Sequence, residues 1–285
     1  MRLSAAISLV LVATAGVAVG VDYLTRTTSI SLGTLLLYRG LIGILLLLLW
    51  HRPSPAELRP REPRMAIARL VAAGLTFVGW FGAIAFLSAP FATALLLLDS
   101  LVLELVKSLR DRTLPSLPEV CVFSCVIGYV GAVSLTRDQL SADFTIGIAL
   151  AVLAIGARTI SMEVWARSCE QGEAELIRIF IPLLGGALTG LVMTFGSLTP
   201  PSFIVLCLIS ATAALGLLTY LTEDQVILRL GAFRTRLVEI FAVPLLAVPQ
   251  LFSGEFGRHP ATVGFMALLA ASTLWAIVAS GNRAI

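Results

Sequence analysis

Long apolar runs follow one another along almost the whole chain, and short polar or proline-containing stretches separate them. Each run is close to the ~20 residues that an α-helix, rising about 1.5 Å per residue, needs to cross a bilayer core. The runs lack the alternation of a β-barrel, and lipid offers no partners for backbone polar groups, so the pattern predicts helices. We expect ten spans: 3–24, 31–50, 65–87, 91–109, 120–136, 145–166, 175–195, 202–221, 230–251 and 261–280.

Composition places the chain among integral membrane proteins. Hydrophobic residues make up 58% of the 285 residues and charged residues 13%, against about 45–50% and about 25% in soluble domains. The formal net charge of +3 resides in short loops between apolar runs, so nucleic acid is not an expected partner. Arginine supplies nearly all the basic residues of the chain. We expect one transmembrane domain over residues 1–285, which crosses the cytoplasmic membrane of a bacterium several times.

The loop charges predict the orientation. Arginine gathers in the loops 51–64, 107–119 and 222–236, which fall on one side if the spans alternate. The opposite loops are nearly free of basic residues. By the positive-inside rule, both termini are expected in the cytoplasm.

A weak repeat relates the two halves at an offset of about 141 residues. Asp22 and Arg26 near the end of the first span match Glu163 and Arg167 near the end of the sixth. Because each half has five spans, the halves (1–138 and 143–285) are predicted to run in opposite directions. Such inverted repeats are typical of secondary transporters, whose binding site lies near the bilayer midplane.

Several short motifs resemble a known family. They are Tyr38-Arg39-Gly40 in the second span, Val243-Pro244-Leu245 in the ninth, Gly254-Glu255 after it and Val263-Gly264-Phe265 in the tenth. With ten spans and short loops, the chain resembles the drug/metabolite transporter superfamily, specifically its EamA-like members. The resemblance implies a ten-helix carrier with two inverted five-helix repeats, and cargo such as small organic metabolites.

Two membrane-embedded carboxylates are the first candidates for substrate binding. Asp99 lies about eight residues into the fourth span, and Glu239 lies at a comparable depth in the ninth. A charge at such depth faces a bundle interior or a watery cavity and by default marks a functional path. The pair could hold a cationic group or retain a proton. The alternative is neutralisation by a neighbour, which Arg236 offers to Glu239 at helical spacing.

Three further residues of the second and third spans complete the expected binding site. Arg39 keeps its charge and must find an anion, either on the substrate or on Asp99 or Glu239. Tyr38 and Trp80 could offer aromatic faces to an organic cation. Packing or contact with lipid would explain both aromatic residues equally.

Ion pairs near the span ends are the expected gates. Asp22 with Arg26 would close the outer side, and Glu163, Arg167 and Arg158 would lie nearer the cytoplasmic side. Pairs at these spacings also form as ordinary helix-surface contacts.

These features predict a secondary transporter that moves a small polar organic metabolite by alternating access, coupled to protons or working by exchange. An amine-bearing or zwitterionic cargo, amino-acid-like or S-adenosylmethionine-like, suits the mixed charges. We expect no enzyme activity, cofactor or metal, because no catalytic or nucleotide motif is found. The alternatives are a membrane-embedded enzyme acting on a lipid head group, and a channel. The expected partners are the substrate and the bilayer, with the protein a monomer or homodimer.

Overall fold

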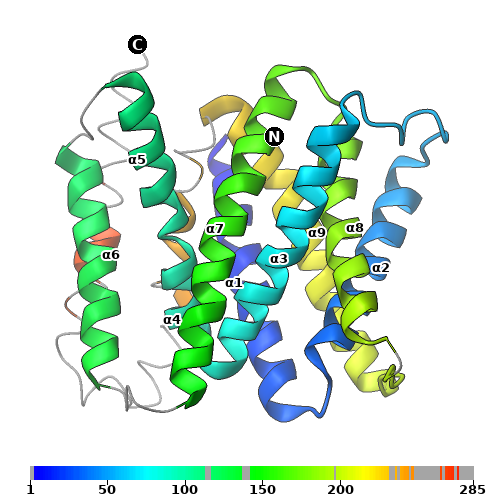
Figure 1. Cartoon of the computed structure of the whole chain (residues 1–285), viewed down its shortest axis with the longest axis horizontal. Coiled ribbons are helices and arrows are strands. Elements are labelled where there is room, and N and C mark those ends of the chain that lie inside the picture. Colours follow the sequence, from blue (N-terminus) through cyan, green and yellow to red (C-terminus); the bar gives the residue numbers. More distant parts are fainter. Residues whose placement is uncertain are drawn as a thin grey trace.

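A computed structural model describes residues 3–112, 117–136, 142–195 and 197–230, and, further on, 235, 238–243, 245–246, 264, 267–272 and 275. All regular structure in these residues is helical. The helices are α1 (Leu3–Thr27), α2 (Leu32–His51), α3 (Pro63–Phe86), α4 (Ala89–Leu96), α5 (Asp99–Asp111), α6 (Leu117–Thr136), α7 (Ala142–Glu170), α8 (Glu175–Met193) and α9 (Phe203–Leu230). They stand side by side as a bundle (Figure 1).

Local sequence explains where these helices begin and end. Ser31 caps α2 by accepting a hydrogen bond from the Thr34 amide at 3.2 Å, and Arg52 ends that helix in a left-handed conformation. Pro63 occupies the first turn of α3. Proline is favoured there because the first N–H groups of a helix have no partner within the helix, so nothing is lost when one is missing.

Six of the described helices are long and apolar enough to cross a membrane: α1, α2, α3, α7, α8 and α9. They match six of the expected spans, and α6 matches the expected span 120–136. The chain is therefore an all-α protein of multi-pass membrane type. The expected spans 230–251 and 261–280 lie largely outside the described residues.

The expected fourth span, 91–109, is two helices instead of one. Between α4 and α5 the Leu98 amide bonds to the carbonyl of Leu95 and the Ser100 amide to that of Leu97, at 3.0 and 3.2 Å. These are tighter three-residue bonds. The Ser100 hydroxyl also donates to the Leu97 carbonyl, which diverts it from the helical ladder. Asp99 consequently starts a new helix and is buried inside the protein.

The expected loop 222–236 is also wrong in its first part, because α9 continues to Leu230. Thr222, Glu223 and Asp224 are buried at 3%, 3% and 1% exposure. Hydrogen bonds within α9 and an ion pair to α8 satisfy Thr222 and Asp224. A polar run that looked like a loop is thus a helical segment facing the bundle interior.

Close helix packing joins α3 with α7, α2 with α8 and α1 with α9 most extensively. Glycines permit this approach. A Cβ at Gly190 in α8 would overlap the backbone of Leu37 in α2, and one at Gly185 would overlap the Leu70 carbonyl of α3. Gly186 and Gly190, which form a small-xxx-small pattern, thus lie where α8 meets α3 and α2.

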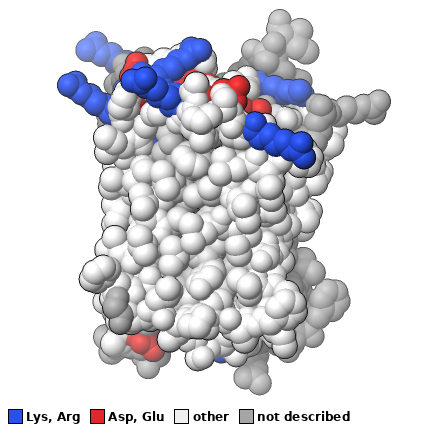
Figure 2. All heavy atoms as spheres, turned by 90° about the vertical axis from the view of Figure 1, so that its right-hand side faces the viewer, with Lys and Arg blue, Asp and Glu red and all other residues white. Residues whose placement is uncertain are grey.

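The outer surface divides into a broad uncharged wall and charged ends. Figure 2 shows Lys and Arg gathered at one end, with the wall below them free of charge. This end carries the α2–α3 loop, with exposed Arg52, Arg59 and Arg61, and the α7–α8 loop; we call it the basic end. Exposed apolar side chains such as Leu41 and Leu45 form a surface suited to lipid.

Candidate functional site

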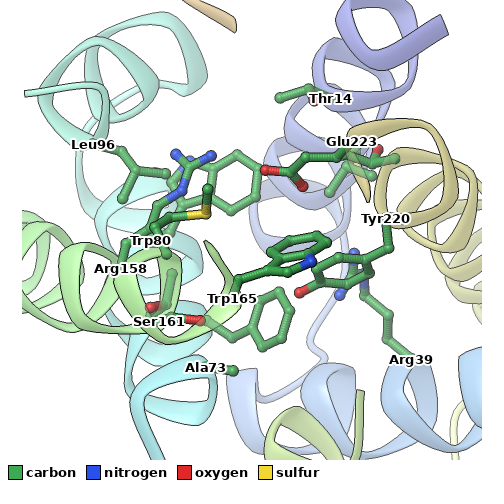
Figure 3. A pocket seen from close by; sticks show the side chains of 16 residues that line it. Thr14, Arg39, Ala73, Trp80, Leu96, Arg158, Ser161, Trp165, Tyr220 and Glu223 are labelled. Carbon is green, nitrogen blue, oxygen red and sulfur yellow. The ribbon is translucent and has the colours of Figure 1, made fainter. Parts of the chain in front are cut away.

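A cavity of about 630 Å³, including space open to solvent, lies inside the bundle. Helices α1, α2, α3, α7 and α9 contribute most of its lining (Figure 3). The lining residues are Thr14, Val17, Arg39, Ala73, Thr76, Phe77, Trp80, Leu96, Arg158, Ser161, Met162, Trp165, Gly216, Thr219, Tyr220 and Glu223.

Arg39 is a buried arginine of the cavity lining that stacks on aromatic rings. Its guanidinium carbon lies 5.1 and 5.0 Å from the ring centroids of Phe77 and Phe81, and the residue is 4% exposed. Among the described residues it has no carboxylate within ion-pair distance, and its Nε lacks a hydrogen-bond partner. A Cβ at Gly216 would overlap its Nη2, so glycine makes room for the guanidinium. The aromatic rings thus hold a cation for which the described part of the chain supplies no carboxylate partner.

A second arginine, Arg158 of α7, is bound by two carboxylates from distant parts of the chain. Its Nη2 lies 2.5 Å from Glu239 Oε2, and its Nε lies 3.5 Å from Asp99 Oδ2. Asp99 and Glu239 are 0% and 1% exposed and do not line the cavity, whereas Arg158 does. The expected pair of carboxylates thus meets at one cation just behind the cavity wall.

Glu223 of α9 adds a third carboxyl group, which lines the cavity. It lies close enough to Glu239 and Arg158 to interact electrostatically with both, and Figure 3 shows its side chain pointing toward Arg158. Three carboxyl groups, those of Asp99, Glu239 and Glu223, thus gather around one guanidinium.

Aromatic side chains form much of the remaining wall. The rings of Trp165 and Tyr220 lie 5.7 Å apart between centroids, and Trp80 lies 5.2 Å from Phe81. In Figure 3 the Tyr220 ring lies beside the guanidinium of Arg39. The cavity thus combines aromatic faces, two guanidinium groups and a carboxyl group.

Nearer the basic end, a polar layer joins four helices. Arg178 of α8 binds Asp224 of α9 with Nε and Nη2 at 2.8 and 2.6 Å. The Trp165 indole N–H donates to the same Asp224, at 2.8 Å. The guanidinium of Arg69 in α3 lies 4.3 Å from the Trp165 ring centroid. We call these four residues the Trp165 layer.

The ion pairs expected at the helix ends are present as contacts. Arg26 lies 2.7 Å from Asp22, and it also binds the Leu87 carbonyl at the junction of α3 and α4. Arg167 lies 3.0 Å from Glu163. Both ion pairs are partly exposed i,i+4 contacts within one helix. The additional hydrogen bond from Arg26 to the Leu87 carbonyl connects α1 to the end of α3.

The grouping of residues differs from the expectation in three respects. Arg158 belongs with Asp99 and Glu239, and not with the pair at the end of α7. The carboxylate partner foreseen for Arg39 is taken by Arg158 instead. Tyr38 packs against the apolar core and is absent from the cavity lining, whereas Trp80 lines it.

Sequence reasoning missed Glu223, Tyr220, Trp165 and Asp224. The apolar positions 217, 220, 226 and 227 continue a helical spacing across the polar run, which is the signal that could have extended α9. Arg69 was missed because it lies near the start of an expected span, where basic residues that flank a membrane helix are common. Among the described residues, no group of three His, Cys, Asp or Glu could hold a metal ion.

Comparison with known proteins identifies a shared fold. No family model matches the sequence, and no curated protein matches it. A solved crystal structure of a protein superposes with a TM-score of 0.66 at 15% sequence identity, covering 94% of this chain and 96% of that chain. At this identity the likeness shows a shared fold alone.

Proposed function

We propose that the protein is a secondary transporter that carries a small polar organic metabolite across the cytoplasmic membrane by alternating access. The observation that carries this proposal is the cavity inside an apolar bundle, lined by Arg39, Arg158 and Glu223. Charged groups inside a membrane-spanning bundle are energetically costly, and their presence is therefore typical of a substrate or ion pathway. A mostly apolar cavity with a few convergent polar groups is the usual form of a small-molecule site.

The proposed architecture is ten helices in two inverted five-helix repeats, as in the EamA-like members of the drug/metabolite transporter superfamily. The helix packing supports it. When α1, α2 and α3 are exchanged with α7, α8 and α9, the pair α1 with α9 becomes α7 with α3, and α2 with α8 becomes itself. These are the three most extensive helix contacts, as a two-fold relation would require.

The lining supports an amine-bearing or zwitterionic substrate, amino-acid-like or S-adenosylmethionine-like. Arg39, whose Nε has no hydrogen-bond partner among the described residues, offers its guanidinium to a carboxylate, and guanidinium forms such contacts in pairs. Glu223 offers a carboxyl group to an ammonium or sulfonium group. Trp80, Trp165 and Tyr220 provide faces for a cation or a flat ring.

Coupling to protons is supported by the carboxyl cluster. Glu223, Glu239 and Asp99 share the single guanidinium of Arg158, an arrangement in which like charges favour a retained proton, and Glu223 lies against the cavity. A cationic substrate that binds Glu223 favours its ionised form and releases that proton. Protons and substrate then compete for one site, which suits exchange.

Orientation completes the proposal. The basic end is placed in the cytoplasm by the positive-inside rule, in a bacterial inner membrane. The cavity lies about halfway along the helices that form it, since Arg158 precedes the end of α7 by about 18 Å at the helical rise. No catalytic step is proposed, and the partners are the substrate and the bilayer.

The test is ligand-dependent stability of the purified protein in detergent, followed by transport in proteoliposomes. A ligand that binds only the folded state adds about 2.7 kcal/mol at a hundredfold excess over Kd. We expect amino-acid-like or sulfonium zwitterions to raise the melting temperature, and Glu223→Gln and Arg39→Gln each to remove the effect. Arg167→Gln, at the end of α7, is the matched control and should keep it.

Proteoliposomes loaded with a pH-sensitive dye then report coupling. Uptake of the stabilising compound should move protons in the wild-type protein and not in Glu223→Gln. Stabilisation by no metabolite of the panel, together with no flux, would overturn the proposal.

A further inference from the structure

Arg69 is a buried cation that the central cavity does not use. It is 2% exposed, and its Nε and Nη2 are buried without a hydrogen-bond partner in the described part of the chain. One face of its guanidinium rests on Trp165, which uses the π-system of the cation and none of its N–H donors.

Such an arrangement is costly for the protein as it stands. A buried donor without an acceptor keeps its full desolvation penalty, and native proteins leave few such groups. An arginine cannot relieve the penalty by giving up its proton. The donors of Arg69 are therefore expected to be used in a bound state.

Arg69 also lines a small pocket. The pocket, about 280 Å³ when space open to solvent is included, lies between α3, the α7–α8 loop and α8, and Glu62, Ser168, Glu173 and Arg178 line it as well. The acidic groups around it are engaged or peripheral. Glu173 accepts from the Arg61 amide at 3.0 Å, Asp224 is bound by Arg178 and Trp165, and Glu62 is exposed.

We propose that this pocket is a second anion-binding site, which takes a carboxylate or phosphate group between Arg69 and Arg178. Arg69 would donate from Nε and Nη2, the paired geometry that guanidinium offers to such groups. Arg178 adds positive charge beside it, while its own donors remain on Asp224 and on the Glu173 carbonyl.

The place of this pocket gives it a role in transport, and this step rests on the proposed function. Trp165 lines the central cavity with its ring and carries Arg69 on it. Seven residues of α7 separate Arg158 from Trp165, about 10 Å at the helical rise. The anionic group of a substrate that passes the Trp165 layer would meet Arg69 on the basic-end side and Arg39 on the cavity side.

The test measures anion binding by the purified full-length protein, without transport. Inorganic phosphate and acetate are titrated at constant ionic strength, with chloride as the reference anion, and tryptophan fluorescence and melting temperature are followed. We expect saturable binding of at least one probe, weakened about tenfold or more, which is about 1.4 kcal/mol, in Arg69→Gln. Arg39→Gln should leave this binding within about twofold.

Two further variants keep the outcome decisive. Arg69→Lys retains the charge and should bind more weakly than wild type but better than Arg69→Gln. Ala66→Leu fills the pocket from the same helix without changing a charge, and should abolish binding even if Arg69→Gln fails to fold. Absence of saturable binding in the wild type, binding unchanged in Ala66→Leu, or loss only in Arg39→Gln would overturn the site. Because none of these readouts needs flux, a failure of the transport proposal would leave them interpretable.

Discussion

Arg158 in α7 binds Glu239 at 2.5 Å, although 81 residues separate them along the chain. Asp99, from the start of α5, reaches the same guanidinium. One cation thus connects α7, α5 and the segment that follows α9, immediately behind the cavity wall. This relation turns three isolated embedded charges into one cluster.

The first prediction concerns the stability that Arg158 provides. Removing one partner of a buried ion pair leaves uncompensated charge and costs about 3–5 kcal/mol. We expect Arg158→Gln to lower the free energy of unfolding by about that amount, measured by denaturant titration in mixed micelles. Arg167→Gln, which breaks a partly exposed pair in the same helix, should cost about 0–1 kcal/mol. Equal losses in the two variants would contradict the buried cluster.

Gly216 tests the position of Arg39. A methyl group at 216 would meet the end of the Arg39 side chain and no backbone, so Gly216→Ala should displace the guanidinium while the helix stays intact. The expected result is a melting temperature close to that of the wild type, with loss of ligand-induced stabilisation. Gly156→Ala in α7 has nothing within 4 Å of the new methyl and should retain it. Full stabilisation in Gly216→Ala would remove Arg39 from the site.

Gly190 tests the contact between α8 and α2. Here the new methyl would overlap Leu37 and lie 2.8 Å from the Gly33 carbonyl oxygen, and backbone cannot rotate away as a side chain can. We expect Gly190→Ala to destabilise by about 1–3 kcal/mol, the usual cost of overpacking. Gly131→Ala in α6, whose methyl meets nothing within 4 Å, is the control. An unfolding curve unchanged by Gly190→Ala would show that α8 and α2 do not approach as closely as the structure has them.

The topology predicts a pattern of cysteine labelling. In a background where the four native cysteines are serine, Ser54→Cys should react with an impermeant maleimide only from the cytoplasmic side. Ser197→Cys, in the α8–α9 loop, should react only from the outside. Thr222→Cys should react from neither side without detergent, because that residue is 3% exposed within α9. Rapid labelling at 222 would restore the loop that the sequence suggested there.

Sequence reasoning found Asp99, Glu239 and Arg39 for one physical reason. A charged residue inside an apolar run can be recognised from the sequence, because the free-energy cost of a charge deep in a bilayer is high. The partner of each charge was not visible. Spacing along a helix reports neighbours three or four residues away, whereas Arg158 approaches Asp99 from another helix.

The same limit explains the misread boundaries. Leu97 and Leu98 belong to an unbroken apolar run, and only the hydrogen bonds around Ser100 show that the helix is interrupted there. Conversely, Thr222–Asp224 are polar enough to suggest a loop, yet Arg178 supplies the charge that lets Asp224 be buried.

The sequence by itself determined the class of protein, the spans that form α1, α2, α3, α6, α7, α8 and α9, and the basic end, because bilayer thickness and charge cost act on each segment separately. Tertiary structure alone decided which charges meet. It placed Arg158 between Asp99 and Glu239, stacked Arg39 and Arg69 on aromatic rings, and made these two arginines part of the lining of two pockets. Those choices depend on how helices distant in sequence pack against each other, and no local pattern records that.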